Sequence, residues 1–116
     1  TQNVDHVRGS YFAFRRDVMD VVGMLDERYF IWFEEVDFCK RVREAGYQIR
    51  YCAEAECHDL VGQSFAQVKV ARKQALFSKS MISYFAKWHP WWQSAILRVV
   101  RPFAITAGAV YDLVKR

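Results

Sequence analysis

The sequence predicts an α/β fold, and three stretches of the chain carry that prediction. Residues 47–52 alternate apolar and polar side chains, as a half-buried strand does. Residues 34–45 keep their apolar side chains on one helical face, and a longer helical pattern runs from residue 65 or 67 to Trp88. With 116 residues and 53% hydrophobic content, the chain can form the core of one domain.

The first predicted elements are short. Residues 9–14 (Gly-Ser-Tyr-Phe-Ala-Phe) predict a largely buried strand. Asp17 is a favoured N-cap residue, so we expect a helix over residues 18–22 that Gly23 ends. A turn and an aromatic stretch at residues 29–33 then lead into the next helix.

The helix predicted over residues 34–45 is amphipathic and stops at Gly46. Glu34, Asp37 and Arg41 share its polar face, because they are three and four positions apart. The residues of its apolar face are Val36, Phe38, Cys39, Val42 and Ala45.

Three carboxylates, Glu34, Glu35 and Asp37, begin this helix. The helix dipole and the unpaired amides of the first turn favour acids at that end. Three acids within four residues exceed what capping requires, and their repulsion is unfavourable unless a metal, a basic group or a proton reaches them. We therefore interpret the cluster as a chemical site, and the alternative is a solvated, capped helix start.

A strand pair, a loop and a long helix are expected to follow. Residues 47–52 and 53–58 predict strands, and Gly62 frees the backbone of a loop at residues 59–63. The long helix should end at Trp88, because the residue before Pro90 is disfavoured in a helix.

The last segment is apolar but interrupted by charge. Charged side chains at the centre of a bilayer cost roughly 2.5–3.5 kcal/mol each, so this segment makes a poor transmembrane span. Trp91 and Trp92 open it and Lys115-Arg116 close it, which favours a helix lying in the headgroup layer of a membrane. The alternative is a terminal helix pair that packs on this domain or on one outside this sequence. The interrupting residues are Arg98, Arg101, Pro102 and Asp112.

Charge is divided unevenly along the chain. Residues 1–68 hold 8 Lys/Arg and 12 Asp/Glu, whereas residues 69–116 hold 9 Lys/Arg and one acid, Asp112. This division predicts an acidic part that carries the site and a basic tail that faces phosphates. The chain begins at Thr1, from which we expect a piece of a longer protein.

The three cysteines favour a reducing compartment. Their odd number and irregular spacing do not suit a disulfide framework. Cys52, Cys57 and His58 could be read as a zinc cluster, but a Cys-x-x-Cys pair is lacking, and buried small apolar side chains are the simpler interpretation.

Several of these motifs, in this order, resemble the C-terminal half of a family 2 glycosyltransferase of the GT-A fold, close to bacterial rhamnosyltransferase-like enzymes. The resemblance covers about residues 7–88. It implies a mixed α/β sheet with flanking helices and an inverting transfer of a sugar from a nucleotide-sugar donor to an acceptor hydroxyl, with Mg²⁺ or Mn²⁺. The motifs are Gly9-Ser-Tyr-Phe-Ala-Phe-Arg-Arg16, Leu25-Asp-Glu-Arg-Tyr-Phe30, Phe33-Glu-Glu-Val-Asp-Phe-Cys-Lys-Arg41, Ala45-Gly-Tyr47 and His58-x-x-x-Gly62-Gln-Ser64.

The resemblance assigns roles to individual residues. Glu35 matches the general base, although the family more often has Asp there, and the longer Glu side chain reaches about one methylene farther. Glu34 and Asp37 would shape the acceptor site or hold Arg41. His58 matches a histidine near the donor diphosphate that helps to hold the metal. The residues expected to bind substrate are Arg15, Arg16, Trp32, Gly62, Gln63 and Ser64.

The family's nucleotide-binding strands and its Asp-x-Asp metal motif are absent from this sequence, and we expect the main metal ligands upstream of it. We divide the chain into an acceptor-side catalytic portion (1–66), a long helix (67–89) and a basic, membrane-associated tail (90–116). The isolated chain is expected to have little or no transferase activity. The expected acceptor is a lipid-linked or cell-surface glycan of bacterial cell-wall or polysaccharide biosynthesis, at the cytoplasmic face of the cell membrane.

Two other classes of function were weighed. A non-enzymatic membrane-surface or interaction module would use the basic aromatic tail, with the acidic helix as a docking face. A nucleic-acid binder would explain the sequence pI of about 9.1, but the apolar runs of the tail are too continuous and no recognition motif occurs. We therefore expect no nucleic-acid partner.

Overall fold

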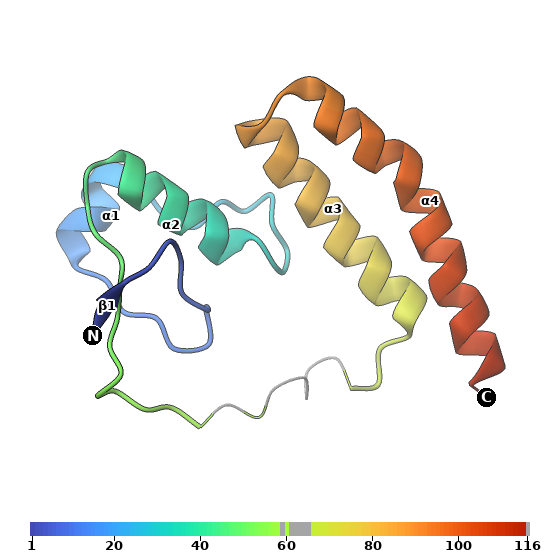
Figure 1. The fold of residues 1–116 in the computed structure, drawn as a ribbon, viewed down its shortest axis with the longest axis horizontal. Helices are drawn as coiled ribbons and strands as arrows, with labels where there is room; N and C mark the ends of the chain where they lie inside the picture. The colour runs from blue at the N-terminus through green and yellow to red at the C-terminus, as the bar shows by residue number, and fades with distance from the viewer. Residues whose placement is uncertain (59, 61–65, 116) are drawn as a thin grey trace. The chain divides into compact units, whose positions relative to one another are not determined.

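A computed structural model describes residues 1–58, 60 and 66–115 (Figure 1). The chain forms two compact units, which are described separately. The N-terminal unit comprises residues 1–27 and the described residues of 33–60, and the hairpin unit comprises residues 28–32 and those described from 66 onward. The elements in chain order are β1 (Gln2–Asn3), α1 (Arg16–Val22), α2 (Glu34–Glu44), β2 (Arg50–Tyr51), α3 (Val70–Trp88) and α4 (Trp91–Val114).

The predicted α/β fold, with its mixed GT-A sheet, is wrong for the described residues. They form four helices, and their one sheet is an antiparallel pair in which Gln2 faces Tyr51 and Asn3 faces Arg50. Residues 9–14 and 53–58 form no strand there. A strand persists only where a neighbour satisfies its backbone groups, and the alternating segment at 47–52 finds that neighbour in β1 alone.

The N-terminal unit packs around the buried face of α2. Phe38 lies at the centre, and the rings of Phe12 and Phe14 lie 5.6 and 5.0 Å from its ring. The predicted strand at 9–14 therefore contributes its aromatic side chains to the core from an irregular backbone. The core cluster of buried residues comprises Val18, Phe38, Cys39, Val42 and Ile49.

Helix α1 ends where the sequence predicted, but it begins earlier than predicted. Gly23 ends it with a φ of 77° and an N–H bond to the Met19 carbonyl. Asp17 does not cap it, because the helix begins earlier, at Arg16, and the Asp17 carboxylate pairs with the Arg15 side chain. The N-cap position is held by Arg15, without a side-chain hydrogen bond.

Helix α2 has the predicted bounds to within one residue, but its buried face differs. Asp37 is fully buried, whereas Ala45 follows the helix and is exposed. The apolar pattern could not indicate this, because an acid on a helix is assigned to the solvent face unless its partner is known.

Helices α3 and α4 form an antiparallel hairpin joined by His89 and Pro90 (Figure 1). The predicted end of the long helix at Trp88 is confirmed. The His89 ring stacks on Phe85, with the ring centres 4.5 Å apart. Segment 28–32 is attached to α3, because Ser80 donates a hydrogen bond to the Ile31 carbonyl (2.7 Å) and Trp32 packs edge-on against Phe77.

Two residues of α4 fix its register on α3. Asp112 accepts hydrogen bonds from the backbone N–H groups of Val70 (2.9 Å) and Ala71 (3.0 Å). These are amides of the first turn of α3, which have no partner within the helix. Gly108 lies so close to Ala71 that an added Cβ would come within 3.0 Å of its backbone. Asp112 of α4 therefore caps the N-terminus of α3.

We expect Asp112→Ala to lower the free energy of unfolding of the hairpin. The two amide bonds, followed by Lys69 and Lys73, hold the pKa of Asp112 below its usual value. A lowered folded pKa means that the stabilisation is present above the unfolded value and is lost as the pH falls through the folded one. The midpoint temperatures of thermal unfolding of wild type and variant should therefore differ at neutral pH and converge in acid. Asp20→Ala, at an exposed acid of α1, is the control.

Candidate functional site

The chain enters α2 through two residues in the left-handed backbone region. Trp32 has a φ of 60° and Phe33 a φ of 70°. Left-handed backbone costs about 1–2 kcal/mol for a residue with a side chain, so two bulky residues in succession store strain at this point. The Phe33 carbonyl accepts the N–H of Asp37 (2.9 Å), and Glu34 becomes the first residue of the helix.

Glu34 and Glu35 each hold one carboxylate oxygen that is buried and lacks a hydrogen-bond partner among the described residues. A buried acceptor without a donor costs about 1–3 kcal/mol, and native structures contain few. Burial raises the pKa of Glu34 above its usual value, and the Glu35 carboxylate raises it further against a lowering backbone hydrogen bond. The helix start therefore presents two carboxylate oxygens that can each accept a further hydrogen bond.

Asp37 is engaged within the fold. Its side chain is 0% exposed, and its Oδ2 accepts a hydrogen bond from Nε of Arg41 (2.9 Å). Arg41 also donates to the carbonyls of Val22 and Met24, the latter at 2.8 Å. Of the two roles considered for Asp37, the structure shows the pairing with Arg41, which ties α2 to the end of α1.

Two neighbours of Glu35 were not singled out from the sequence. A Cβ added at Gly9 would lie 3.9 Å from the Cβ of Glu35, so the glycine that begins the 9–14 segment lies beside the base of this side chain. Cys39, one turn along α2, is a buried thiol whose pKa is raised by burial and, in smaller part, by the Glu35 charge. The glycine in the motif at residues 9–16 was the available signal for the first contact.

The residues expected to bind substrate differ in how far they are free to do so. Arg15 is exposed, but Asp17 holds its guanidinium through two hydrogen bonds and raises its pKa. Arg16 is exposed in the first turn of α1, and Trp32 is half-buried against α3. Gly62, Gln63 and Ser64 lie outside the described residues.

The described residues do not form a metal site. His58 is exposed, and no group of three His, Cys, Asp or Glu side chains that could hold a metal occurs in residues 1–58, 60 and 66–115. Cys52 and Cys57 are exposed free cysteines, so they are not the buried apolar side chains expected from the sequence. This part of the chain therefore does not fit Mg²⁺ or Mn²⁺ on its own.

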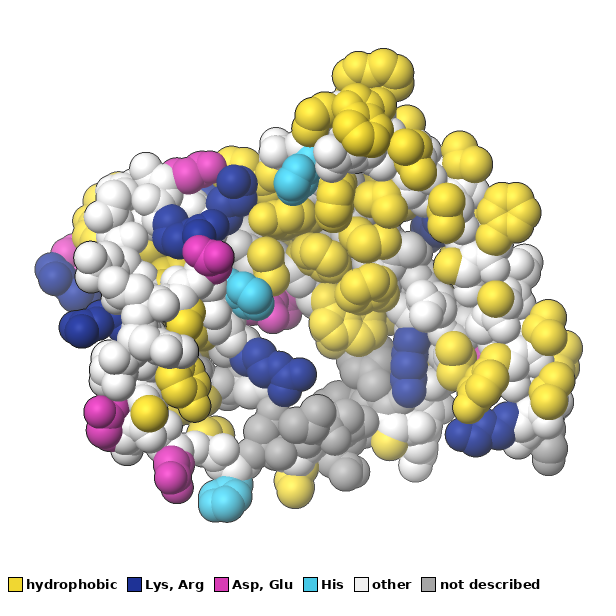
Figure 2. Space-filling view, viewed as in Figure 1, with side chains coloured by type: hydrophobic (Ala, Val, Ile, Leu, Met, Phe, Trp, Pro, Cys, Tyr) yellow, Lys and Arg dark blue, Asp and Glu magenta, His cyan; other side chains and the backbone are white. Residues whose placement is uncertain are grey.

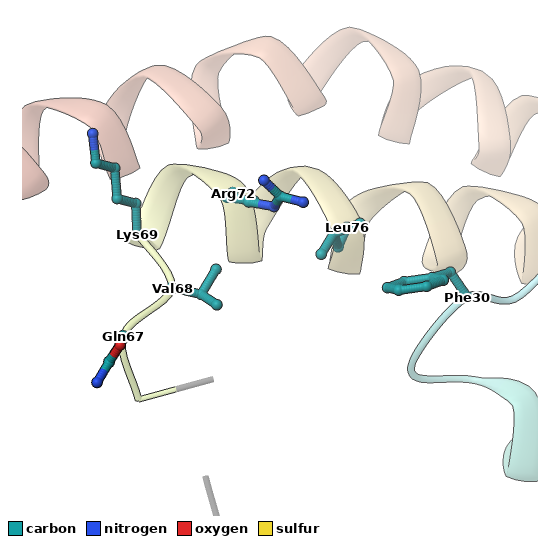
Figure 3. Close-up of a pocket in the computed structure, with 6 residues that line it drawn as sticks. All are labelled: Phe30, Gln67, Val68, Lys69, Arg72 and Leu76. Atoms are coloured by element: carbon teal, nitrogen blue, oxygen red, sulfur yellow. The ribbon is translucent and has the colours of Figure 1, made fainter. Parts of the chain in front are cut away.

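The hairpin unit contains an open hollow of about 540 Å³ at the start of α3 (Figure 3). Arg72 and Leu76 line it from α3, Lys69 and Val68 from the segment before the helix, and Phe30 from a separate loop. None of the predicted site residues is among its described lining residues. The hollow combines two cations with apolar side chains, and it is separate from the carboxylates in sequence.

We expect Asp37→Ala to destabilise the protein by about 3–5 kcal/mol, because it leaves the half-buried Arg41 guanidinium without its carboxylate. Chemical denaturation measures the change. Asp5→Ala is the matched control, because it removes the carboxylate that pairs with Arg43 on the exposed surface, and the unfolding midpoint should stay nearly constant. Equal effects of the two variants would contradict the assigned role of the buried pair.

Glu34→Gln should stabilise the protein at neutral pH. A raised folded pKa means that ionised Glu34 is less stable in the folded protein than in the unfolded chain, so stability is lost as the pH rises through the folded value. Gln carries no such charge. Denaturation curves of variant and wild type should therefore separate at neutral pH and approach one another below the usual Glu value of 4.5. A wild type that is the more stable of the two at neutral pH would refute this.

Comparison with known proteins gives a relationship over part of the chain. It is 37% identical over 49 residues to the low-salt glycan biosynthesis hexosyltransferase Agl10 of Haloferax volcanii, covering 42% of this chain and 16% of that protein. It is 34% identical over 95 residues to an N-acetylglucosaminyl-diphospho-decaprenol L-rhamnosyltransferase of Mycobacterium tuberculosis, covering 82% of this chain.

The chain spans 31% of the length of the rhamnosyltransferase. No family model and no solved structure matches it. Both relatives are named as transferases of a sugar unit, and the longer match includes most of the motifs' range. The chain is therefore related in sequence to glycosyltransferases.

Proposed function

We propose that this chain is the acceptor side of an inverting glycosyltransferase, with the start of α2 as the place where the acceptor hydroxyl is deprotonated. The observation that carries the proposal is the pair of adjacent carboxylates, Glu34 and Glu35, each with a buried oxygen that lacks a donor among the described residues. The relationship to glycosyltransferases supports it.

The chemistry requires one such carboxylate. In an inverting transfer the acceptor oxygen forms a bond to the anomeric carbon while the bond from that carbon to the donor's phosphate oxygen breaks. The acceptor proton passes to a general base, and nucleoside diphosphate leaves. We assign the base to Glu35, from the resemblance. Glu34 is the rival, because its raised pKa brings it nearer to the pH at which a carboxylate exchanges protons efficiently.

The relatives suggest the class of substrate. The rhamnosyltransferase acts, by its name, on an N-acetylglucosaminyl diphosphate attached to decaprenol, and the hexosyltransferase serves glycan biosynthesis. We propose for this chain a nucleotide-sugar donor and a lipid-linked glycan acceptor, which would place the reaction at the cytoplasmic face of a membrane.

The remaining predicted residues take supporting roles. We propose that Asp37, through Arg41, positions α2 and does not touch the substrate. Arg16 and Trp32 remain predictions for substrate binding, and Arg15 would first have to leave Asp17. A requirement for Mg²⁺ or Mn²⁺, with His58 as one ligand, stays a prediction of the resemblance, and no step is assigned to the metal here.

The direct test is release of nucleoside diphosphate by the full-length protein from a panel of sugar nucleotides, with lipid-linked acceptors present. Release that depends on one donor and on the acceptor would support a transferase. A folded protein that releases nothing from any donor, in acceptor-containing membranes, would count against the proposal.

Glu35→Gln should lower turnover by about 10²–10⁴-fold and leave donor affinity nearly unchanged, as loss of a general base does. The same assay on Glu34→Gln separates the two carboxylates, because the larger loss identifies the base. Glu44→Gln, at the exposed far end of α2, is the matched control and should retain turnover. Full turnover in Glu35→Gln would remove Glu35 from the role assigned to it.

A further inference from the structure

The contact between α3 and α4 includes several polar and small side chains. Four residues of α4 that face α3 are small or charged: Ser94, Arg101, Gly108 and Asp112. Arg101 donates to the hydroxyl of Ser78, which is buried in α3. Arg101, one of the charges that interrupt the apolar segment in the sequence, therefore bonds between the two helices.

The opposite face of α4 is apolar along the whole helix. Its residues recur at steps of three, four or seven positions, which places them in one stripe on a helix of about 36 Å. Phe103, in the middle of the stripe, is 69% exposed. Figure 2 shows apolar side chains gathered along α4. We call this stripe the outer face: its exposed residues are Trp92, Ile96, Val99, Phe103, Val110 and Val114.

Charge is kept off the outer face. Among the described residues of α4, Arg101 and Asp112 bond to α3, and Arg98 is one position, or about 100°, away from Val99. A soluble helical hairpin normally buries its apolar stripe and exposes its polar one. Here much of the apolar surface of α4 is instead left exposed on the described part of the chain.

We propose that the outer face of α4 docks into the headgroup and acyl boundary of an anionic lipid bilayer. Trp91 and Trp92, both exposed at the start of the helix, suit the polar–apolar boundary of a membrane. This proposal goes beyond the transferase reaction and does not rest on it.

The charge of the hairpin selects a lipid surface over a second copy of the chain. Residues 69–116 carry nine Lys/Arg and one acid, and that acid, Asp112, is occupied with the amides of α3. Two copies meeting through their outer faces would bring two strongly basic hairpins together, whereas an anionic bilayer attracts each one. Exposed cations on the hairpin include Lys69, Arg72, Lys79, Arg98 and Lys115.

The lysines of α3 indicate that α4 lies on the membrane and does not cross it. By length and composition α4 could span a bilayer. However, α3 packs along it and carries Lys73, Lys79 and Lys87, which would be costly within the hydrocarbon. The hairpin therefore lies in the interface, with α4 toward the acyl chains and α3 toward water.

The test is flotation of the full-length protein with vesicles of phosphatidylcholine plus phosphatidylglycerol, and with vesicles of phosphatidylcholine alone. Phe103→Ser should weaken binding to the anionic vesicles at least about 10-fold, the effect of withdrawing one large apolar side chain from the acyl boundary. Val110→Ser should act in the same direction. Phe30→Ser is the matched control, since Phe30 is an 80% exposed phenylalanine outside α4, and binding should stay constant.

Circular dichroism and analytical ultracentrifugation complete the test. Binding that prefers anionic vesicles, falls with salt and is lost in both α4 variants with helix content retained would support the proposal. Equal binding of wild type and Phe103→Ser, or equal binding to neutral vesicles, would overturn it. A concentration-dependent dimer that Phe103→Ser dissociates, without vesicle binding, would also overturn it and assign the face to a second copy. Because the readout is binding, it is independent of any transferase activity.

Discussion

The N-terminal unit depends on the buried pair of Asp37 and Arg41. Burying two charges is expensive, and the cost is met only where every remaining hydrogen-bonding group is satisfied. Arg41 meets this condition by spanning from Asp37 to the Val22 and Met24 carbonyls, on either side of the positive-φ turn at Gly23. The pair thereby fixes α2 against the end of α1, and with it the position at which the acidic helix start emerges.

Two unfavourable features then coincide at that helix start. Trp32 and Phe33 have left-handed backbone, and the carboxylates that follow them each bury an oxygen without a described donor. Proteins tolerate such local conflicts where function requires them and compensate elsewhere. The Asp37–Arg41 pair and the packing of Phe38 supply that compensation one turn later on the same helix.

The sequence predicted what local patterns determine and missed what distant partners determine. Apolar periodicity, Gly23 and the His89-Pro90 step located all four helices to within a few residues. The sheet prediction failed because the partner of a strand lies far away in sequence, and only Arg50–Tyr51 found one. Asp37 was placed on the polar face for the same reason, since it is buried against Arg41, whose other donors bond to the distant carbonyls of Val22 and Met24. The cluster of acids is visible in the sequence, whereas the oxygens of Glu34 and Glu35 that lack a donor among the described residues are not.

The uneven charge of the chain means that the two parts of the sequence interact differently with an anionic bilayer. An anionic bilayer attracts residues 69–116, with nine cations against one acid, and repels residues 1–68, where acids outnumber cations by twelve to eight. This field acts within about one Debye length, roughly 8 Å at physiological salt, so it orients the chain only at contact. Apolar burial of the outer face would supply the affinity, and the cations of the hairpin would make the binding selective for an anionic surface over a neutral one.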